Sequence, residues 1–535
     1  MSTVAHILSQ TLLEAGIDIV FGLPGGENSE LMDALRKARL RFVLVRNENS
    51  AVFMADVQAR LTGKPGVVLT TLGPGVANAY AGIAHAWLDR APVLLITAQT
   101  PRRLLDHHTH QVIDTQAIMR PVTKHTEELT TMGVAARVHN ALTLSMDGRP
   151  GIVHLGISSE TAGLEALDDN NEATNNTVTK HDHAQPQLTE SVKHLLAHAQ
   201  RPVLVVGLGL EPEQPYSALL KLAEALDAPV IVTPKAKGAL PDDHALAAGV
   251  IGLTRSDPAY EILDEADLII AIGFDVVELV KPWQPSTPLI WVANWQNVDP
   301  KIAAIAEFVG PMSPILQQMT TSAISHLHHW GAQRVANFRQ KLASRALPAP
   351  QNGKLLPQTV LQILREATPR NIFVSTDVGS HKILAALTWP AYAPNRYMLS
   401  NGLSSMGFGL PAAAAAALTL NASTLCITGD AGMAMVMGEL GLVAELGLPV
   451  ITVVMNDNAL DLIRSHQKRL GKQTFGVEFA NPDWLQVAAA YGIDGYRVGS
   501  ESELHTAITA AFTQRKPALI EALIDPISYP TTPKS

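Results

Sequence analysis

The sequence predicts an α/β protein built from three doubly wound domains, each with a mostly parallel sheet. Short runs of Val, Ile and Leu alternate with longer segments of helical periodicity along the chain. These runs are continuously apolar, which is typical of strands buried on both faces, as in parallel sheets covered by helices. The chain has 535 residues, 47% of them hydrophobic. That exceeds the ~250–300 residues that one core usually holds, so several domains are expected.

Composition narrows the classes of function. The net charge is −9, so the chain lacks the positive excess of a general nucleic-acid binder. The single cysteine, Cys426, excludes an internal disulfide and fits a reducing cytosol. Residues 2–18 read as an amphipathic helix and not as a signal peptide, and the Ala-rich stretch 411–420 is too short to span a membrane. We expect a cytoplasmic protein with neither a nucleic-acid nor a membrane partner.

Two linker-like stretches divide the chain. Residues 163–187 are rich in Asn, Asp and Thr, and 343–357 are marked by Pro and Gly. We expect domains at 1–165, 188–335 and 355–530. The expected strands are 18–24, 42–48, 66–71 and 92–98, then 202–207, 229–234, 268–273 and 289–294, then 372–377, 424–430, 450–456 and 517–524.

Two of these strands end in an acidic residue. Strand 424–428 ends at Gly429-Asp430, one helical segment follows, and the next strand ends at Asn456-Asp457. In such a βαβ unit the strands are parallel neighbours about 4.8 Å apart, so Asp430 and Asp457 can converge. Two bare carboxylates would repel, and Mg²⁺ would resolve this. The residues alone also allow both to be helix caps.

The helix expected after Asp430 starts with small residues. Ala431 and Gly432 would leave backbone N–H groups open to a phosphate at the positive helix terminus. The local chemistry therefore suggests Mg²⁺ bridging the protein to a diphosphate.

This stretch resembles a known motif. GDAG, followed 27 residues after Asp430 by Asp457, is similar to the thiamine-diphosphate motif of 2-oxo acid decarboxylases and acetolactate synthases. The resemblance implies that Asp430, Asp457 and the carbonyl of Ala459 hold Mg²⁺. The family usually has Asn where this chain has Asp457, so the site gains a negative charge and its metal preference stays open.

The resemblance also implies a glutamate that acts on the cofactor. Residues 42–79 match the family's signature of strand, N-E, helix, GKPG, strand and GPG. Glu48 would hydrogen-bond the aminopyrimidine ring and so assist removal of the C2 proton. The alternative for Glu48 is a first-turn acid favoured by the helix dipole.

Further contacts are implied by the matching loops. The loop 21–30 would place Pro24 and Gly26 near the pyrimidine and substrate, and Met406 would wedge beneath the cofactor unless it only fills core space. The remaining implied cofactor contacts are Asn78, Gly379, Ser380, His381, Gly402, Ser404, Gly429, Ala431, Gly432 and Leu462.

Two other motifs leave alternatives. DHHTHQ (106–111) could bind zinc, but no fourth ligand is nearby. The resemblance instead puts His110 and Gln111 at the substrate end of the site, and it does not align His107-His108 with the paired histidines of some pyruvate decarboxylases. GLGLEP (207–212) is half a dinucleotide fingerprint, so NAD is not expected, while FAD is left open and not favoured.

The resulting hypothesis is a thiamine-diphosphate- and Mg²⁺-dependent enzyme that decarboxylates a small, pyruvate-like 2-oxo acid and ligates the product into a 2-hydroxy ketone or acid. His466 replaces the Trp of anabolic acetolactate synthases, which puts their preference for 2-oxobutyrate in doubt. One alternative is a benzoylformate-type decarboxylase, although Thr71 or a neighbour stands where that group has its catalytic His. Another is a non-catalytic paralogue, against which Glu48 argues. The resemblance implies at least a homodimer, commonly a homotetramer.

Overall fold

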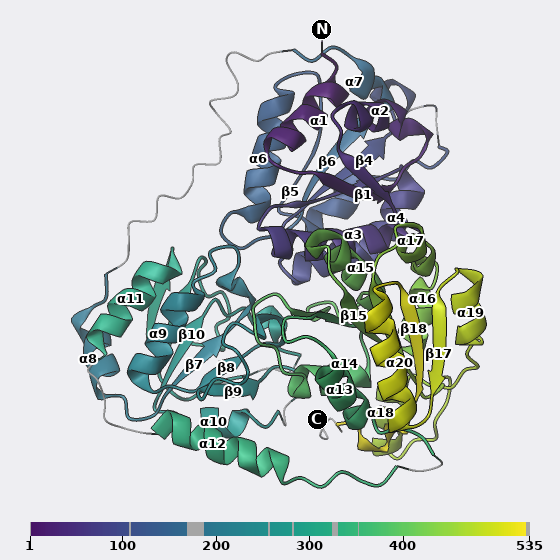
Figure 1. The fold of residues 1–535 in the computed structure, drawn as a ribbon. Helices are drawn as coiled ribbons and strands as arrows, with labels where there is room; N and C mark the ends of the chain where they lie inside the picture. Colours follow the sequence, from purple (N-terminus) through teal and green to yellow (C-terminus); the bar gives the residue numbers. More distant parts are fainter. Residues whose placement is uncertain are drawn as a thin grey trace. The chain divides into compact units, whose positions relative to one another are not determined.

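The computed structural model describes residues 2–105, 107, 109–167, 187–254, 257–280, 283–323, 330–350 and 353–530 (Figure 1). These residues form three six-stranded sheets, and the strand pairs within each sheet are parallel. The predicted fold class is therefore confirmed. The described residues belong to two compact units, one from 1–182, 403–422 and 436–448, the other from 183–402, 423–435 and 449–535.

The first sheet belongs to the first unit and is covered by helices on both faces. One face packs against α1, α2 and α6, and the other against α3, which also contacts α4 and α15. The strands, in sheet order, are β2 (Arg41–Leu44), β1 (Ile19–Leu23), β3 (Gly66–Thr70), β4 (Val93–Gln99), β6 (Val153–Ser158) and β5 (His125–Glu128). The helices of this unit are α1 (Val4–Glu14), α2 (Ser29–Lys37), α3 (Glu48–Thr62), α4 (Gly73–Leu88), α5 (Thr115–Met119), α6 (Val134–Met146), α7 (Ser159–Gly163), α15 (Gly409–Leu420) and α17 (Glu439–Glu445).

The middle sheet shows why its runs are continuously apolar. Along β7 (Pro202–Val206), Val203 and Val205 enter one buried cluster while Leu204 and Val206 enter another, so both faces are covered. The other strands are β12 (Ala306–Val309), β11 (Leu289–Ala293), β10 (Leu268–Ile272), β8 (Val230–Val232) and β9 (Ala247–Val250). Its helices are α8 (Glu190–His198), α9 (Tyr216–Leu226), α10 (Tyr260–Leu263), α11 (Met312–Ser322) and α12 (Trp330–Ala343).

The third sheet has the same strand order as the first sheet: β14 (Tyr397–Leu399), β13 (Phe373–Thr376), β15 (Thr424–Gly429), β16 (Val450–Asn456), β18 (Ala518–Leu523) and β17 (Asp494–Val498). Its helices are α13 (Pro357–Ala367), α14 (Ser380–Thr388), α16 (Asp430–Val436), α18 (Asp461–Arg469), α19 (Trp484–Ala490) and α20 (Glu501–Gln514).

Some sequence expectations were wrong in detail. The single helix expected between Asp430 and Gly447 is interrupted, because α16 ends at Val436 and α17 begins at Glu439. The run 42–48 was expected to be buried on both faces, but β2 is an edge strand and most of it is partly or fully exposed. Six strands were not expected at all, namely β5, β6, β9, β12, β14 and β17. No helix among the described residues has the length and apolar character needed to cross a bilayer.

Candidate active site

The two acidic residues lie at the carboxyl-terminal edge of the third sheet, the side at which its central strands β15 and β16 end. β15 and β16 are parallel neighbours, with Gly429 opposite Met455. Asp430 and Asp457 directly follow these strands at their carboxyl ends, where ligands bind in doubly wound sheets. The prediction that the βαβ unit brings these strands side by side is confirmed.

The Asp430 carboxylate is buried and held by three donors. Its Oδ2 accepts from the Asn458 N–H at 2.8 Å and from Asn481 Nδ2 at 2.7 Å, and its Oδ1 accepts from the Ala431 N–H at 2.8 Å. Burial raises the pKa of Asp430, while these hydrogen bonds act in the opposite direction. In this structure the Ala431 N–H donates to Asp430 itself, and its contact with a phosphate stays a prediction.

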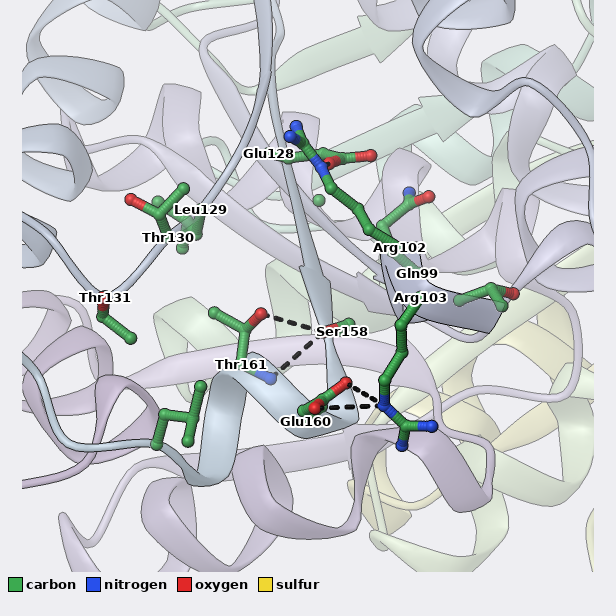
Figure 2. A pocket seen from close by; sticks show the side chains of 13 residues that line it. Gln99, Arg102, Arg103, Glu128, Leu129, Thr130, Thr131, Ser158, Glu160 and Thr161 are labelled. Carbon is green, nitrogen blue, oxygen red and sulfur yellow. Dashed lines mark hydrogen bonds and ion pairs between the residues drawn. The ribbon is translucent and has the colours of Figure 1, made fainter. Parts of the chain in front are cut away.

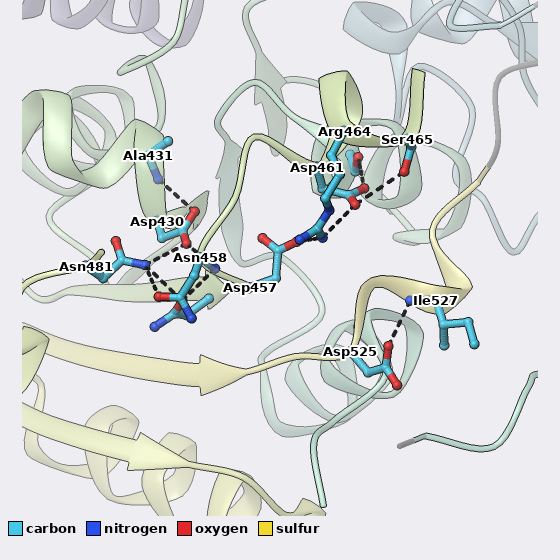
Figure 3. Close-up of polar contacts among 12 residues, drawn as sticks. Asp430, Ala431, Asp457, Asn458, Asp461, Arg464, Ser465, Asn481, Asp525 and Ile527 are labelled. Carbon is cyan, nitrogen blue, oxygen red and sulfur yellow. Dashed lines mark hydrogen bonds and ion pairs between the residues drawn. The ribbon is translucent and has the colours of Figure 1, made fainter. Parts of the chain in front are cut away.

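The Asp457 carboxylate is held by an arginine of the following helix. Arg464 Nη2 lies 2.5 Å from Asp457 Oδ2 and 3.0 Å from Asp461 Oδ1. Figure 3 shows the Asp457 side chain pointing toward Arg464. Burial raises the pKa of Asp457 to about 7, with Asp430 and Asp461 adding to the rise and Arg464 opposing it. Asp457 thus sits among like charges that one guanidinium does not fully offset.

This donor set fits a hard divalent cation. With all three carboxyls ionised, Asp430, Asp457 and Asp461 carry three negative charges against one positive charge on Arg464, a balance of −2. Carboxylate and carbonyl oxygens are the ligands that Mg²⁺ takes. Ala459, the third implied ligand through its carbonyl, is buried and pairs with Glu478 in an isolated bridge. Mg²⁺ therefore fits the chemistry of this edge.

A cavity of about 510 Å³ borders the same edge. Ser380 and Leu462, two of the implied cofactor contacts, line it together with Asp461 and Arg464. The Ser380 hydroxyl donates to Asp461 Oδ2 at 2.7 Å, which ties the start of α14 to the start of α18.

His381 gives the strongest indication that this edge binds a ligand. The residue is 5% exposed, and its Nε2 is buried without a hydrogen-bond partner. Burial lowers its pKa to about 4, so the imidazole is neutral at pH 7. A Cβ added at Gly379 or Gly429 would lie 2.7 Å or 2.9 Å from His381 Cε1, so both strand ends approach the ring closely. A diphosphate oxygen is a suitable partner for this orphaned nitrogen.

Gly432 is also required by its surroundings. A Cβ there would lie 2.6 Å from Asp377 Oδ2, the carboxylate of a fully buried residue at the end of β13. Thr428 Oγ1 donates to the same oxygen at 3.2 Å. Gly432, the second glycine of the GDAG motif, is therefore needed for packing against Asp377.

Glu48 lies in the first unit, at the first residue of α3. It is 5% exposed, and Asn78 Nδ2, from α4, donates to its Oε2 at 3.2 Å. Asn47 caps the helix by accepting from the Asn49 N–H at 2.9 Å. The structure thus brings together Glu48 and Asn78, which the sequence placed 30 positions apart.

The loop after β1 lies in the same unit. Pro24 is half-buried, and Gly26 is exposed to open space, since no atom lies within 4 Å of a Cβ added there. Thr71 Oγ1 donates to Glu27 Oε2 at 3.2 Å, and a Cβ at Gly25 would lie 2.1 Å from that hydroxyl. Thr71 therefore packs on this loop.

Three other implied residues lie in segment 401–413, which the two units share. Gly402 belongs to the second unit, whereas Ser404 and Met406 belong to the first. Ser404 has a φ of +53°, and Met406 is half-buried. Their contacts with a cofactor stay predictions.

His110 and Gln111 are exposed in a turn before α5. Gln111 has a φ of +60°, and its carbonyl oxygen would lie 2.4 Å from a Cβ at Gly73, the first residue of α4. Asp106 and His108 of the same motif lie outside the described residues. Among those described, the one group of three or more His, Cys, Asp or Glu side chains close enough to share a metal is Asp56, His85 and Asp89.

That group is internally satisfied. Asp56 Oδ1 lies 2.7 Å from Arg60 Nε, and its Oδ2 lies 3.1 Å from His85 Nε2. His85 Nδ1 lies 3.3 Å from Asp89 Oδ2. It is a buried charge network that joins α3 to α4, which is its structural role.

A second cavity, of about 320 Å³, lies at the carboxyl ends of β4, β5 and β6. Figure 2 shows Arg103 directed at Glu160, 3.1 Å away, and Arg102 lies 2.9 Å from Glu128. Each arginine is therefore already paired, and none of the residues implied for catalysis lines this cavity.

The glycine-rich loop after β7 is filled by the protein's own side chains. The Leu208 N–H donates to Glu278 Oε2 at 2.8 Å, and a Cβ at Gly209 would lie 2.2 Å from the Trp295 ring. In dinucleotide-binding folds such loop amides and glycines face the pyrophosphate. The residues at this crevice therefore do not fit a flavin dinucleotide in this conformation.

Sequence reasoning did not indicate three residues that contact the proposed Mg²⁺ ligands Asp430 and Asp457 or lie beside them, namely Asp461, Arg464 and Asn481. Arg464 and Asp461 are three positions apart on α18, a spacing typical of helical ion pairs, so this signal was available. Asn481, whose amide contacts Asp430, lies 51 positions further along the chain, and no local pattern marks it.

Comparison with known proteins identifies the family. Residues 2–118 match the thiamine pyrophosphate enzyme N-terminal TPP binding domain, 189–319 the central domain, and 377–522 the C-terminal TPP binding domain. The chain is 31% identical to the acetolactate synthase isozyme 3 large subunit of Escherichia coli (strain K12), covering 95% of this chain and 92% of that protein. It is 29% identical to a probable acetolactate synthase large subunit of Methanococcus aeolicus (98% and 92% covered) and 30% identical to the acetolactate synthase large subunit of Lactococcus lactis subsp. lactis (97% and 92% covered). These matches support an acetolactate-synthase-like function that depends on thiamine pyrophosphate, which is thiamine diphosphate. The chain belongs to the family of thiamine-pyrophosphate-dependent enzymes that includes the acetolactate synthase large subunits.

Proposed function

We propose that this enzyme uses Mg²⁺ and thiamine diphosphate to decarboxylate a small, pyruvate-like 2-oxo acid and to join the remaining fragment to a second carbonyl compound, giving a 2-hydroxy ketone or acid. The proposal is carried by the set of side chains at the carboxyl-terminal edge of the third sheet. There Asp430 and Asp457 follow neighbouring parallel strands, and the buried His381 Nε2 has no protein partner.

The residues divide into two tasks. Asp430, Asp457 and the Ala459 carbonyl would hold Mg²⁺, and Gly379, Ser380 and His381, at the start of α14, would hold the diphosphate. Arg464 offsets part of the carboxylate charge before the metal arrives.

Glu48 would hold and transfer a proton at the aminopyrimidine ring. Its burial and the Asn78 hydrogen bond keep the carboxyl group in one place, as proton transfer requires. Thiamine diphosphate, when bound, supplies the carbon nucleophile and the electron sink of the reaction.

Product analysis tests the choice between ligation and simple decarboxylation. A panel of pyruvate, 2-oxobutyrate and benzoylformate should be incubated with enzyme, Mg²⁺ and thiamine diphosphate, and CO₂ measured together with the organic products. The proposal predicts CO₂ with acetolactate or acetoin from pyruvate. Free acetaldehyde as the sole organic product would favour the decarboxylase alternative, and turnover of none of these acids would overturn the proposed substrate class.

We also propose that the enzyme works without FAD. The support is the occupied loop after β7, where Glu278 and Trp295 take the space that a dinucleotide needs. An absorbance spectrum of the purified protein should lack flavin bands, and stoichiometric flavin would contradict this.

The family resemblance supports at least a homodimer, with a homotetramer as the expected assembly. Mixing two inactive variants, Glu48→Gln and Asp430→Ala, tests whether each site takes residues from two subunits. Recovery of activity on mixing, after subunit exchange, is expected. No recovery, with light scattering showing a monomer, would contradict the proposal.

A further inference from the structure

The turn that leads into Glu48 is held by a single buried carboxylate. β2 ends at Leu44 and α3 begins at Glu48, so the Arg46 and Asn47 amides fall between the two elements. Both N–H groups donate to one oxygen, Glu439 Oε1, at 3.0 Å each. Glu439 is 2% exposed and is the first residue of α17.

Glu439 comes from a distant part of the sequence. It lies nine positions after Asp430, in a stretch that belongs to the same compact unit as Arg46 and Asn47. The contact therefore spans 393 positions of the chain for Arg46 and 392 for Asn47. Within the part of the chain that the structure describes, these two amides donate to no other acceptor, so the turn depends on this side chain.

The opposite side of Glu48 is held by α4. Asn78 Nδ2 donates to Glu48 Oε2, and a Cβ at Gly75 would lie 3.5 Å from Glu48 Oε1. Further along, the Gly82 N–H donates to Asn49 Oδ1 at 2.7 Å, which keeps α3 and α4 in close contact. The Glu48 side chain is thus held from α4, while the two backbone amides just before it are held by Glu439.

We propose that Glu439 is a positioning residue for Glu48, acting through the Arg46 and Asn47 amides and touching neither substrate nor cofactor. This inference rests on the proton-transfer role proposed for Glu48. Proton transfer needs the carboxyl within hydrogen-bond reach of its partner, and a misplacement of about 1 Å can cost on the order of 100-fold in rate. Loss of both hydrogen bonds to Glu439 would let the turn relax and displace the Glu48 carboxyl group by about 1 Å.

The test is hydrogen–deuterium exchange at C2 of bound thiamine diphosphate, measured on the full-length enzyme by acid quench and proton NMR. Glu439→Ala should slow this exchange about 10- to 100-fold. Glu439→Asp, whose carboxylate is one methylene shorter, should also slow it. Glu439→Gln keeps a carbonyl oxygen for both amides and should exchange within about threefold of wild type.

Glu445→Gln is the matched control. Glu445 lies on the same helix but is exposed, and it pairs with the Arg46 guanidinium instead of its backbone. This variant should exchange at the wild-type rate. Affinity for thiamine diphosphate, measured by calorimetry with Mg²⁺, should change less than about threefold in all Glu439 variants that fold.

The outcomes separate the inference from the function on which it rests. Normal exchange in both Glu439→Ala and Glu439→Asp, with slow exchange in Glu48→Gln, would overturn the positioning role alone. Glu439→Gln as slow as Glu439→Asp would also overturn it, because acceptor geometry would then not matter. Normal exchange in Glu48→Gln would instead refute the proposed role of Glu48. If Glu439→Ala does not fold, the Asp and Gln variants still decide.

Discussion

Glu278 gives the most quantitative prediction, because its carboxyl group is buried in the middle domain. It accepts from the Leu208 N–H at 2.8 Å and from Thr233 Oγ1 at 2.5 Å. Burial raises its pKa to about 8 from an ordinary value of 4.5, while the two hydrogen bonds oppose the rise. Folded protein therefore keeps a proton on Glu278 at neutral pH that the unfolded chain has lost.

The sign and size of the effect follow from proton linkage. Below pH 4.5 both states are protonated, so Glu278 has no pH-dependent effect on stability. Between pH 4.5 and about 8 the unfolded chain ionises first, and the free energy of unfolding falls by about 1.4 kcal/mol per pH unit. Over that window the loss is on the order of 5 kcal/mol, and it stops once the folded state also ionises.

Glu278→Gln replaces the ionisable carboxyl group with an amide of similar shape that stays neutral at every pH tested. Urea unfolding of wild type and variant at several pH values between about 5 and 8 should show the variant gaining stability over wild type as pH rises, by several kcal/mol in total. Glu190→Gln, at an exposed carboxyl on α8 of the same domain, is the control for the same substitution made at the surface. A difference between Glu278→Gln and wild type that is flat across this range would refute the buried, protonated Glu278.

Three further changes test the site. Asp457→Ala should weaken Mg²⁺-dependent thiamine diphosphate binding at least about tenfold by calorimetry, while the exposed Asp494→Ala should not; unchanged binding would remove Asp457 from the metal ligands. His381→Ala should weaken thiamine diphosphate binding about tenfold, because a charge-assisted hydrogen bond is lost. The exposed His505→Ala is the control. Equal affinity of the two variants would mean that His381 Nε2 does not contact the cofactor. Gly432→Ala places a methyl group 2.6 Å from Asp377 Oδ2 and should lower the free energy of unfolding, measured by thermal denaturation, by about 1–3 kcal/mol. Gly26→Ala is the control, because a Cβ there meets open space. Equal stability of the two variants would contradict the packing seen at Gly432.

The strands that sequence reasoning found are mostly central ones, where both faces are buried and the apolar run is unbroken. Five of the six missed strands, β5, β9, β12, β14 and β17, are the edge strands of their sheets, and they are short and in several cases partly exposed. The sixth, β6, is central, but His154 and Gly156 interrupt its apolar run. His154 is buried because Thr97 and Thr126 hydrogen-bond both ring nitrogens, a compensation that only tertiary structure reveals.

The candidate site shows the same division. Asp430, Asp457 and Glu48 could be named because strand ends and motif spacing mark them. Asn481 and Glu439 could not, because each acts on a site residue far away in the sequence and follows no local pattern. The Asp457–Arg464 pair explains how this chain accommodates Asp where the family usually has Asn.

Calorimetric titration of thiamine diphosphate into wild-type enzyme and Asp430→Ala, each with Mg²⁺ and with EDTA, tests the metal edge most directly. Wild type should bind one cofactor per chain with Mg²⁺, lose at least about tenfold in affinity in EDTA, and the variant should bind weakly in both. Equal affinity of wild type with and without the metal, or of wild type and Asp430→Ala with it, would contradict the account.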